Sequence, residues 1–385
     1  MGYTFMVPAK IISGENVIAE LGKHIEVKGK KALIVTDQFM VKFGNVAKVE
    51  AALKHAGFSY VIFDGANSEP TDKIVEAGLL VYNQQGCDFI IALGGGSPMD
   101  TAKAIGFMST VPAGTKINAF MHRNIDMKVP YLVAIPTTAG TGSEVTKNTI
   151  ISDTENNVKM LLGGPSIIPA LAVVDPTFTM TAPPKVTAAT GIDALCHAIE
   201  AYTSRKAQPL TDTFALSAIA KIYQNLPLCY ADGKNVKARL AMSLAALEAG
   251  IAFNNASVTI VHGMSRPIGA LFHIAHGVSN AILLPACMEF AIEENTERFA
   301  DIARIMGVAE EDTPAKEAAK AFVKDVTRFC QAVGIPTLAE LGVKKEDFFA
   351  KLDKMAADAL ESGSPQNTMR VPHKDEIVEI YKKLF

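Results

Sequence analysis

The chain of 385 residues is longer than the roughly 250 to 300 residues at which a single hydrophobic core stops growing, so it predicts two domains. Hydrophobic residues make up 49% of the chain and charged residues 20%, a globular composition that excludes a disordered protein. The formal net charge is -3 and no dense run of Lys and Arg occurs, which excludes nucleic acid as a partner.

The N-terminus shows no signal for export or for membrane attachment. The segment "MGYTFMVPAKIISGENVIAE" has no basic flank before an uninterrupted apolar run, and Met6 stands where a myristoylation signal has Ser or Thr. No uncharged apolar run of about 18 residues occurs, so we expect no membrane span. The five cysteines are odd in number and widely spaced, which favours a reducing cytoplasm over a disulfide framework.

Short apolar strands alternate with helical patterns in the first half of the chain. The strand candidates are 31–37, 60–65, 88–97 and 131–144, and amphipathic segments at 46–55 and 73–84 lie between them. This alternation predicts an α/β N-terminal domain over residues 1–180, with a parallel, Rossmann-like sheet and helices on both faces. Ligands of such sheets bind at the carboxyl ends of the strands.

The second half of the chain has a different pattern. Ala, Leu, Lys and Glu dominate with helical spacing, and strand signals become scarce. We therefore expect an all-α C-terminal domain over residues 181–385. The loop at 175–185 is interrupted by three prolines and marks the boundary.

The strand candidate at 88–97 ends in a glycine-rich turn formed by Gly94, Gly95 and Gly96. Ser97 is the expected N-cap of the next helix, and Pro98 its first residue. Backbone N–H groups at such a helix start suit a pyrophosphate, because no side chains obstruct them. The turn matches neither the Gly-x-Gly-x-x-Gly fingerprint nor a Walker sequence. A tight turn without a ligand is the alternative interpretation.

A second candidate phosphate loop, "PTTAGTGSE", spans residues 136–144 after a later strand. It offers the hydroxyl groups of Thr137, Thr138, Thr141 and Ser143. Two such loops on parallel strands favour a dinucleotide over a mononucleotide. Asp37, at the end of the earliest clear strand, can accept bonds from an adenosine ribose and would repel a 2′-phosphate, which favours NAD. An ordinary turn aspartate is the alternative for Asp37.

Histidines are concentrated in one segment. Three of the eight in the chain, His262, His273 and His276, lie within residues 261–277, and histidine serves mainly as a proton carrier or a metal ligand. Asp193 and His197 are four residues apart in an apolar helical pattern, where an unpaired carboxylate is costly and a cation can offset that cost.

Together, one carboxylate and three imidazoles suit Fe(II) or Zn(II), and the candidate ligands are Asp193, His197, His262 and His276. The alternatives are packed or solvent-facing histidines and a surface Asp/His pair.

The chain resembles the iron-containing, group III alcohol dehydrogenases over essentially its whole length. Their signatures occur in order and with the right spacing in "GGGSPMDTAKAI", "PTTAGTGSEVT", "GIDALCHAIEAY" and "VHGMSRPIGALFHIAHGVSNAILLP". The resemblance implies a dinucleotide-binding domain followed by a helical domain and a divalent metal. It makes Asp193, His197, His262 and His276 the metal ligands. It places Gly95, Gly96, Ser97 and Asp100 at the pyrophosphate, and Thr137, Thr138 and Lys159 near the nicotinamide half.

The resemblance further implies an NAD-dependent enzyme that interconverts an alcohol and an aldehyde or ketone by hydride transfer, with the metal as a Lewis acid. Its partner is then a small alcohol or aldehyde, and its assembly a homodimer or a larger homo-oligomer. Glycerol dehydrogenase-like and dehydroquinate synthase-like enzymes share the fold but usually have a different ligand set. A non-enzymatic nucleotide-binding or metal-storage module is a further alternative.

One position departs from the family pattern. Many members carry a second histidine four residues after the ligand at the position of His262, and here that residue is Arg266. Arginine stays protonated and cannot relay a proton, so a relay must run elsewhere, and His273 is the nearest alternative by sequence unless it is a helix-surface residue. The candidate catalytic residues are thus Arg266, His273 and the proposed ligand His276. A guanidinium near the metal can hold a carboxylate, which raises the hypothesis of a hydroxy-acid dehydrogenase. Alternatively, Arg266 pairs with an acidic neighbour.

Overall fold

The computed structural model describes residues 2–156 and 158–385. The chain forms two compact units. One consists of residues 6–182, and the other of Pro183–Phe385 together with residues 2–5.

The first unit contains a six-stranded sheet in which all paired strands are parallel. In spatial order its strands are β1 (Lys10–Ser13), β8 (Leu171–Val174), β5 (Leu132–Pro136), β4 (Phe89–Gly94), β2 (Lys31–Val35) and β3 (Ser59–Phe63). The strands predicted from the sequence are present as β2, β3, β4 and β5. β1 and β8 were not predicted, because four residues are too few to show a periodicity.

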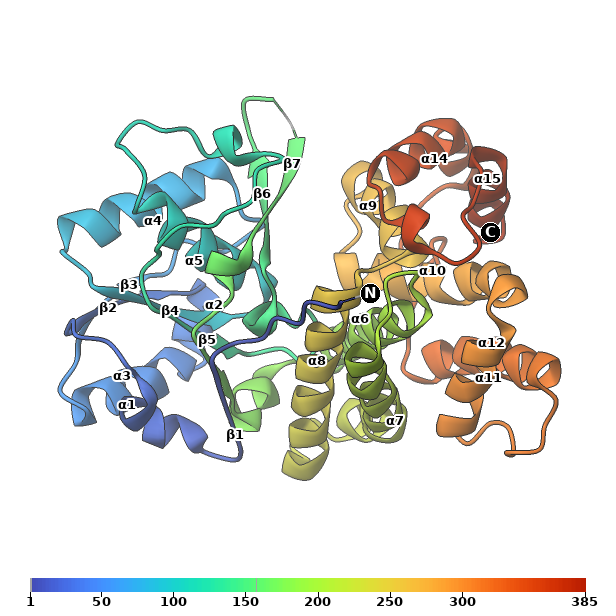
Figure 1. Ribbon diagram of the computed structural model, residues 1–385, viewed down its shortest axis with the longest axis horizontal. Helices are drawn as coiled ribbons and strands as arrows, with labels where there is room; N and C mark the ends of the chain where they lie inside the picture. The colour runs from blue at the N-terminus through green and yellow to red at the C-terminus, as the bar shows by residue number, and fades with distance from the viewer. Residues whose placement is uncertain (1, 157) are drawn as a thin grey trace. The chain divides into compact units, whose positions relative to one another are not determined.

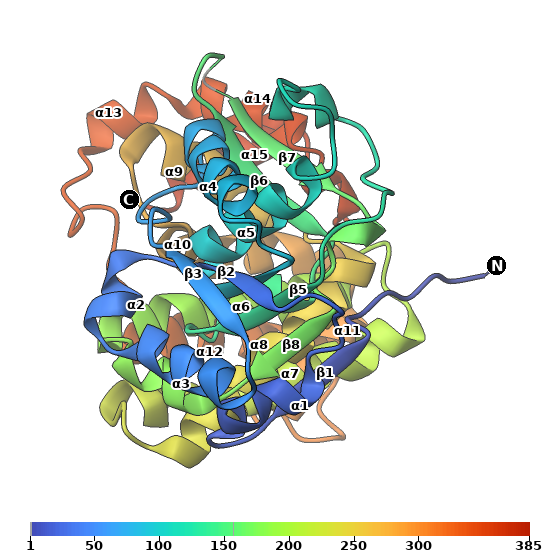
Figure 2. The same ribbon diagram turned by 90° about the vertical axis from the view of Figure 1, so that its left-hand side faces the viewer.

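Helices cover both faces of this sheet, because successive strand residues point to opposite sides. Leu33 and Val35 belong to the core under α4 (Asp72–Gln84) and α5 (Gly96–Met108). Ala32 and Ile34 belong to the opposite core, which α1 (Leu21–His24) and α3 (Asn45–His55) complete. Figure 2 shows α4 and α5 on one side of the sheet and α1 and α3 on the other. The predicted parallel sheet with helices on both faces is confirmed.

The same unit contains elements that the sequence did not predict. An antiparallel hairpin of β6 (Asn148–Asp153) and β7 (Val158–Gly163) packs through β6 against α5 (Figure 1). The proline-containing segment expected to be an irregular loop forms a 3-10 helix, η5 (Pro176–Thr181), because Asp175 caps it and Pro176 suits a first helical position. The remaining short elements are η1 (Val17–Glu20), α2 (Gln38–Lys42), η2 (Ile117–Phe120), η3 (Ser143–Val145) and η4 (Pro165–Ile167).

All the regular elements described in the second unit are helices, as predicted. Three long helices, α6 (Pro184–Thr203), α7 (Pro209–Ala231) and α8 (Val236–Ala256), pack side by side (Figure 1). The others are α9 (Ile260–Phe272), α10 (His276–Ala291), η6 (Ile292–Glu294), α11 (Thr296–Ile305), α12 (Ala315–Ala332), α13 (Lys345–Phe349), α14 (Leu352–Glu361), η7 (Pro365–Asn367) and α15 (Lys374–Lys382). Helix α6 is buried over nearly its whole second half, so any charged side chain there needs a partner.

The first residues of the chain lie against the helical unit. The Nε2 of Gln208 donates to the carbonyl oxygen of Thr4 at 3.2 Å, and the rings of Phe5 and Phe214 stack with centroids 5.9 Å apart.

No single helix in the described residues is long and apolar enough to cross a membrane. Only α8 and α9 taken together reach the required length and apolarity, and they meet at a bend of 103°.

Candidate functional site

Three side chains from different helices of the second unit converge at one point. Asp193 comes from α6, His262 from α9 and His276 from the first turn of α10. One ligand atom from each lies within 4.8 Å of the others. The Oδ1 of Asp193 is 3.6 Å from the Nε2 of His262 and 3.8 Å from the Nε2 of His276. Segments separated by up to 83 positions thus build one cluster, which contains three of the four residues that the sequence suggested as metal ligands.

Gly277 makes the close approach of α10 to α6 feasible. A Cβ atom at this position would lie 2.7 Å from the carbonyl oxygen of Ala189, which is backbone and cannot move aside. Any larger residue after His276 would therefore push α10 away from α6 and separate His276 from Asp193.

The cluster fits a divalent cation. Ligand atoms bound at about 2.1 Å in a tetrahedral site are about 3.4 Å apart, close to the 3.6 and 3.8 Å found between Asp193 and the two histidines. A carboxylate oxygen and imidazole nitrogens are the donors that Fe(II) and Zn(II) accept. Burial by itself would raise the pKa of Asp193, but the surrounding histidines lower it well below its usual range, so the carboxylate is ionised.

Glu200 orients one of the converging histidines, a role that the sequence reading missed. This wholly buried residue of α6 accepts a hydrogen bond from the Nδ1 of His262 through Oε2. Its Oε1 accepts from the hydroxyl of Thr259 at 2.8 Å and from the backbone N–H of Val261 at 2.7 Å. This arrangement fixes the imidazole with Nε2 toward Asp193, the usual support of a metal-binding histidine.

Glu200 and His262 each stabilise the charged form of the other. Burial acts to lower the pKa of His262, but the carboxylates of Glu200 and Asp193 outweigh it and raise the pKa to about 9. Burial likewise acts to raise the pKa of Glu200, and the interaction with His262 lowers it instead. A signal for Glu200 was present in "HAIEAY", because an acidic residue in an apolar helix needs a partner as much as Asp193 does.

His197 lies beside the cluster but outside the set of converging atoms. Its buried ring stacks between Phe253 and His262, with centroid distances of 4.2 and 4.5 Å. Burial lowers its pKa to about 4, so the imidazole is neutral. Its Nδ1 is buried and has no hydrogen-bond partner. A neutral ring with an unsatisfied buried nitrogen fits a role next to a cation.

Asn280 also reaches the cluster and was not predicted. It is wholly buried and lies one turn after His276 on α10. Its Nδ2 is 2.6 Å from the Oδ1 of Asp193, 3.1 Å from the Nε2 of His262 and 3.2 Å from the Nε2 of His276. Its Oδ1 is buried without a partner.

Arg266 and His273 occupy different environments. Arg266 lies one turn after His262 on α9, is only partly exposed and makes no ion pair with a described residue. Burial lowers the pKa of its guanidinium and the nearby Glu200 raises it. His273 ends α9 with a φ of 54° and is exposed. In the described residues, His273 makes none of the ring contacts that join His197, His262 and His276.

In the first unit, the glycine-rich turn joins β4 to α5, but the helix starts earlier than expected. Gly94 has a φ of 154°, which favours glycine, and a Cβ atom there would lie 2.4 Å from the Cγ of Pro98. The helix therefore begins at Gly96 with Gly95 as its N-cap, and the prediction of Ser97 as N-cap and Pro98 as first residue is wrong. The N-cap residue Gly95 has no side chain that could accept from the first N–H groups of α5.

The second loop lies directly beside this turn. The N–H of Thr137 donates to the carbonyl oxygen of Gly94 at 3.0 Å. A Cβ atom on Gly95 would be 3.5 Å from the hydroxyl of Thr138, and one on Gly96 would be 3.4 Å from the Cγ2 of Thr141. Both loops thus meet at the carboxyl ends of β4 and β5, where ligands of parallel sheets bind.

Asp100 and Ser143 are engaged in a buried polar network. The hydroxyl of Ser143 donates to Asp100 at 3.1 Å and accepts from the Nζ of Lys103 at 3.0 Å. Lys103 also donates to the carbonyl oxygens of Thr146 and Asn148, each at 2.9 Å. Burial lowers the pKa of Lys103 to about 8, although Asp100 acts to raise it. This network ties the second loop and the following hairpin to α5.

The remaining candidates lie apart from these loops. Asp37 caps α2 by accepting from the N–H of Met40 at 3.0 Å through one carboxylate oxygen. Lys159 lies on β7 and pairs with Glu69 at 2.8 Å, with both side chains about half exposed at 49% and 48%.

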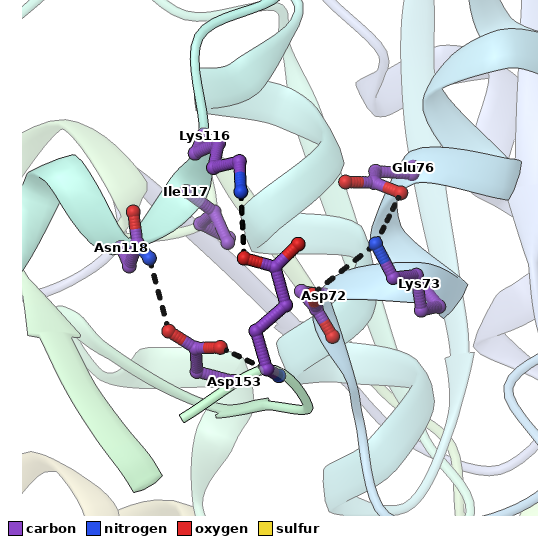
Figure 3. Close-up of a pocket in the computed structure, with 8 residues that line it drawn as sticks. Asp72, Lys73, Glu76, Lys116, Ile117, Asn118 and Asp153 are labelled. Carbon is purple, nitrogen blue, oxygen red and sulfur yellow. Dashed lines mark hydrogen bonds and ion pairs between the residues drawn. The ribbon is translucent and has the colours of Figure 1, made fainter. Parts of the chain in front are cut away.

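A separate polar pocket of the first unit contains none of the candidate residues. Its lining consists of Asp72, Lys73, Glu76, Lys116, Ile117, Asn118, Asp153 and Glu155. Its charges pair with one another, as Lys116 does with Glu155 at 2.6 Å. Figure 3 shows the pair of Lys73 and Glu76, which are 3.3 Å apart. These pairs make it a surface ion-pair network.

Comparisons with known proteins agree with this geometry. The model of the iron-containing alcohol dehydrogenases matches residues 8–176, and that of the C-terminal part of the Fe-containing alcohol dehydrogenase family matches residues 187–385. The chain belongs to the iron-containing alcohol dehydrogenase family.

Members of this family resemble the chain over its whole length. The 1,3-propanediol dehydrogenase of Citrobacter freundii is 39% identical, with 100% of this chain and 99% of that protein covered. The NAD-dependent methanol dehydrogenase of Bacillus methanolicus is 38% identical, with 98% of both covered. The crystal structure of a 1,3-propanediol oxidoreductase has a TM-score of 0.96 at 38% identity and covers 100% of both chains.

Proposed function

We propose that this alcohol dehydrogenase uses a divalent metal and NAD to interconvert a small alcohol and its aldehyde or ketone. The observation that carries the proposal is the convergence of Asp193, His262 and His276, supported by Glu200. When bound, the cation stabilises an alkoxide as a Lewis acid, so that hydride can leave the carbinol carbon. No observation favours the glycerol dehydrogenase-like, dehydroquinate synthase-like or non-enzymatic alternatives.

The protein residues then have defined tasks. Asp193, His197, His262 and His276 hold the cation, and Glu200 keeps the Nε2 of His262 directed at it. The metal is Fe(II), for which the family is named, with Zn(II) as the alternative that accepts the same donors.

The N-terminal domain predicted over residues 1–180, which corresponds to the unit of residues 6–182, binds the cofactor, and the C-terminal domain predicted over residues 181–385 binds the metal. The free N–H groups at the start of α5, with Gly94, Gly95, Gly96 and Ser97, bind the pyrophosphate. Thr137, Thr138 and Thr141 line the adjacent loop, while Asp100 and Ser143 hold that loop in place. Asp37 contacts the adenosine ribose, and Lys159 lies toward the nicotinamide half. NAD is the cofactor named for the Bacillus methanolicus relative.

Metal removal and reconstitution test this function. Protein stripped with a chelator should neither oxidise 1-propanol with NAD nor reduce propanal with NADH, and anaerobic addition of Fe(II) should restore both reactions. Zn(II) added in parallel identifies the preferred ion. Full turnover by protein that contains less than a tenth of an equivalent of metal would contradict the proposal.

Arg266 supports a narrower substrate class. The guanidinium of Arg266 is largely buried one turn from His262 and makes no ion pair with a described residue, although Glu200 is near enough to oppose the lowering of its pKa by burial. Its donors are thus available to an anionic group of a substrate. We therefore propose that the substrate is a hydroxy acid or another alcohol with an anionic group, held bidentately by Arg266. His273 remains the candidate for moving the proton, because Arg266 cannot release one and His276 holds the cation.

The location and the assembly are proposals as well. All five cysteines are buried and free, which favours a reducing compartment such as the cytoplasm. We propose a homodimer or a larger homo-oligomer, with a small molecule as its only other partner. A monomeric mass in solution at micromolar concentration would contradict the assembly.

A further inference from the structure

Asn280 carries a role that the ligand set alone does not explain. Its Nδ2 lies within hydrogen-bonding distance of the Oδ1 of Asp193 and of the Nε2 atoms of His262 and His276, although an amide nitrogen has only two hydrogens to donate. The amide can therefore donate to at most two of these three neighbours. The other end of the amide, Oδ1, is buried and has no partner at all.

This arrangement suits the metal-free protein only. Without a cation, the partial positive charge of the NH2 group compensates Asp193, which lies 2.6 Å away. A cation bound among the same three atoms would repel that NH2 group. A half-turn of the amide exchanges Nδ2 and Oδ1 with almost no change of shape, and it would present an oxygen lone pair to the cation instead.

We propose that Asn280 is a positioning residue that changes roles on metal loading: it donates to the ligand atoms when the site is empty and accepts toward the cation when it is filled. The inference rests on the proposed function, because it needs a metal at this site. It explains why a polar side chain with an unsatisfied oxygen is tolerated at 0% exposure. It makes metal affinity depend on the oxygen of residue 280.

Two variants separate the donor role from the acceptor role. Asn280→Asp keeps an oxygen toward the cation, but it loses the NH2 donor and places a second carboxylate beside Asp193. We therefore expect the metal-free variant to melt at a lower temperature than wild type, and the variant to bind metal at least tenfold more tightly. Asn280→Leu has a similar volume but no oxygen, and we expect metal binding about 10- to 100-fold weaker.

The affinity is measured with Co(II), by competition with a chelator and by the visible absorption of the bound ion, which reports changes in its ligands. Melting temperatures with and without Co(II) should show a wider gap in Asn280→Asp than in wild type and a narrower gap in Asn280→Leu. Ser279→Ala is the matched control, because it removes a partly buried hydrogen bond to the carbonyl oxygen of His276 in the same turn of α10 without touching a ligand atom.

Equal affinities in wild type and both variants would show that Asn280 only fills space and would overturn the proposal. Tighter binding in Asn280→Leu would overturn it too, because the amide would then be a competitor of the metal. Weaker binding in Asn280→Asp would contradict the acceptor role. Failure of the wild-type protein to take up Co(II) would overturn the proposed function together with this inference, which distinguishes the two failures.

Discussion

Glu200 and His262 form a buried carboxylate–imidazole pair in which the Nδ1 of His262 donates to Oε2 of Glu200. Glu200 lies on the side of the imidazole opposite to Asp193. It therefore directs the Nε2 of His262 at the candidate metal position. Carboxylates in such positions raise the basicity of a metal-binding histidine and fix its tautomer.

The first prediction concerns this pair. Glu200→Gln removes the charge but keeps the size of the side chain, and we expect metal affinity to fall about 10- to 100-fold. Equilibrium competition with a chelator measures the effect. Glu248→Gln is the control, because it breaks a carboxylate pair with Lys221 elsewhere in the helical unit. Equal metal affinities in Glu200→Gln and wild type would show that Glu200 serves packing alone.

The second prediction concerns pH and Lys103. Because burial lowers its pKa in the folded protein to about 8 from 10.5, the unfolded chain binds one more proton between these values. The contribution of Lys103 to the free energy of unfolding should therefore rise as the pH increases from about 8 to 10.5, by about 3 kcal/mol at most. Below pH 8 both states are protonated and the contribution is constant.

Lys103→Met provides the reference for this test. The difference in unfolding free energy between wild type and Lys103→Met, measured with urea at several pH values, isolates the contribution of Lys103 from that of other groups. A difference that stays flat or declines between pH 8 and pH 10.5 would contradict the lowered pKa.

The third prediction concerns cofactor choice and Asp37. The wild-type enzyme should prefer NADH to NADPH, because the carboxylate repels a 2′-phosphate. Since Asp37 also caps α2, Asp37→Asn is a cleaner test than Asp37→Gly, as asparagine caps a helix equally well without the charge. We expect Asp37→Asn to reduce the ratio of kcat/KM for NADH over NADPH. A wild-type preference for NADPH would exclude this role of Asp37.

The fourth prediction concerns Arg266. If its guanidinium holds an anionic group of the substrate, Arg266→His should lower kcat/KM more for 4-hydroxybutyrate than for 1-propanol. The difference in transition-state stabilisation should be about 2 kcal/mol, the size of a charged hydrogen bond. The comparison uses kcat/KM of both substrates in wild type and variant. An equal loss on the two substrates would eliminate the anionic substrate class while leaving the metal site untouched.

The sequence predicted the chemistry of the helical unit better than its geometry. Asp193 and His276 were recognised by residue type and motif, although only the packing of α6 against α10 brings them to 3.8 Å. Glu200 and Asn280 were missed, because glutamate and asparagine are common on helices and become informative only once their burial is known.

In the sheet unit, the residue preferences of helix starts misplaced the beginning of α5. Ser97 and Pro98 are typical of a helix start, but the positive φ of Gly94 turns the chain so sharply that α5 begins before both of them. The short strand β1 could not be predicted, because its residues form a strand only through their pairing with β8.

We propose that Asp193, His197, His262 and His276 hold one catalytic metal ion. The most direct test is the metal content of the purified Ala variants at each position, together with their affinity for NADH measured by fluorescence. We expect every variant to lose the ion and nearly all activity while NADH binding stays within about threefold of wild type, since the proposed phosphate loops lie in the other unit. One equivalent of metal retained by both His262→Ala and His276→Ala would contradict the account.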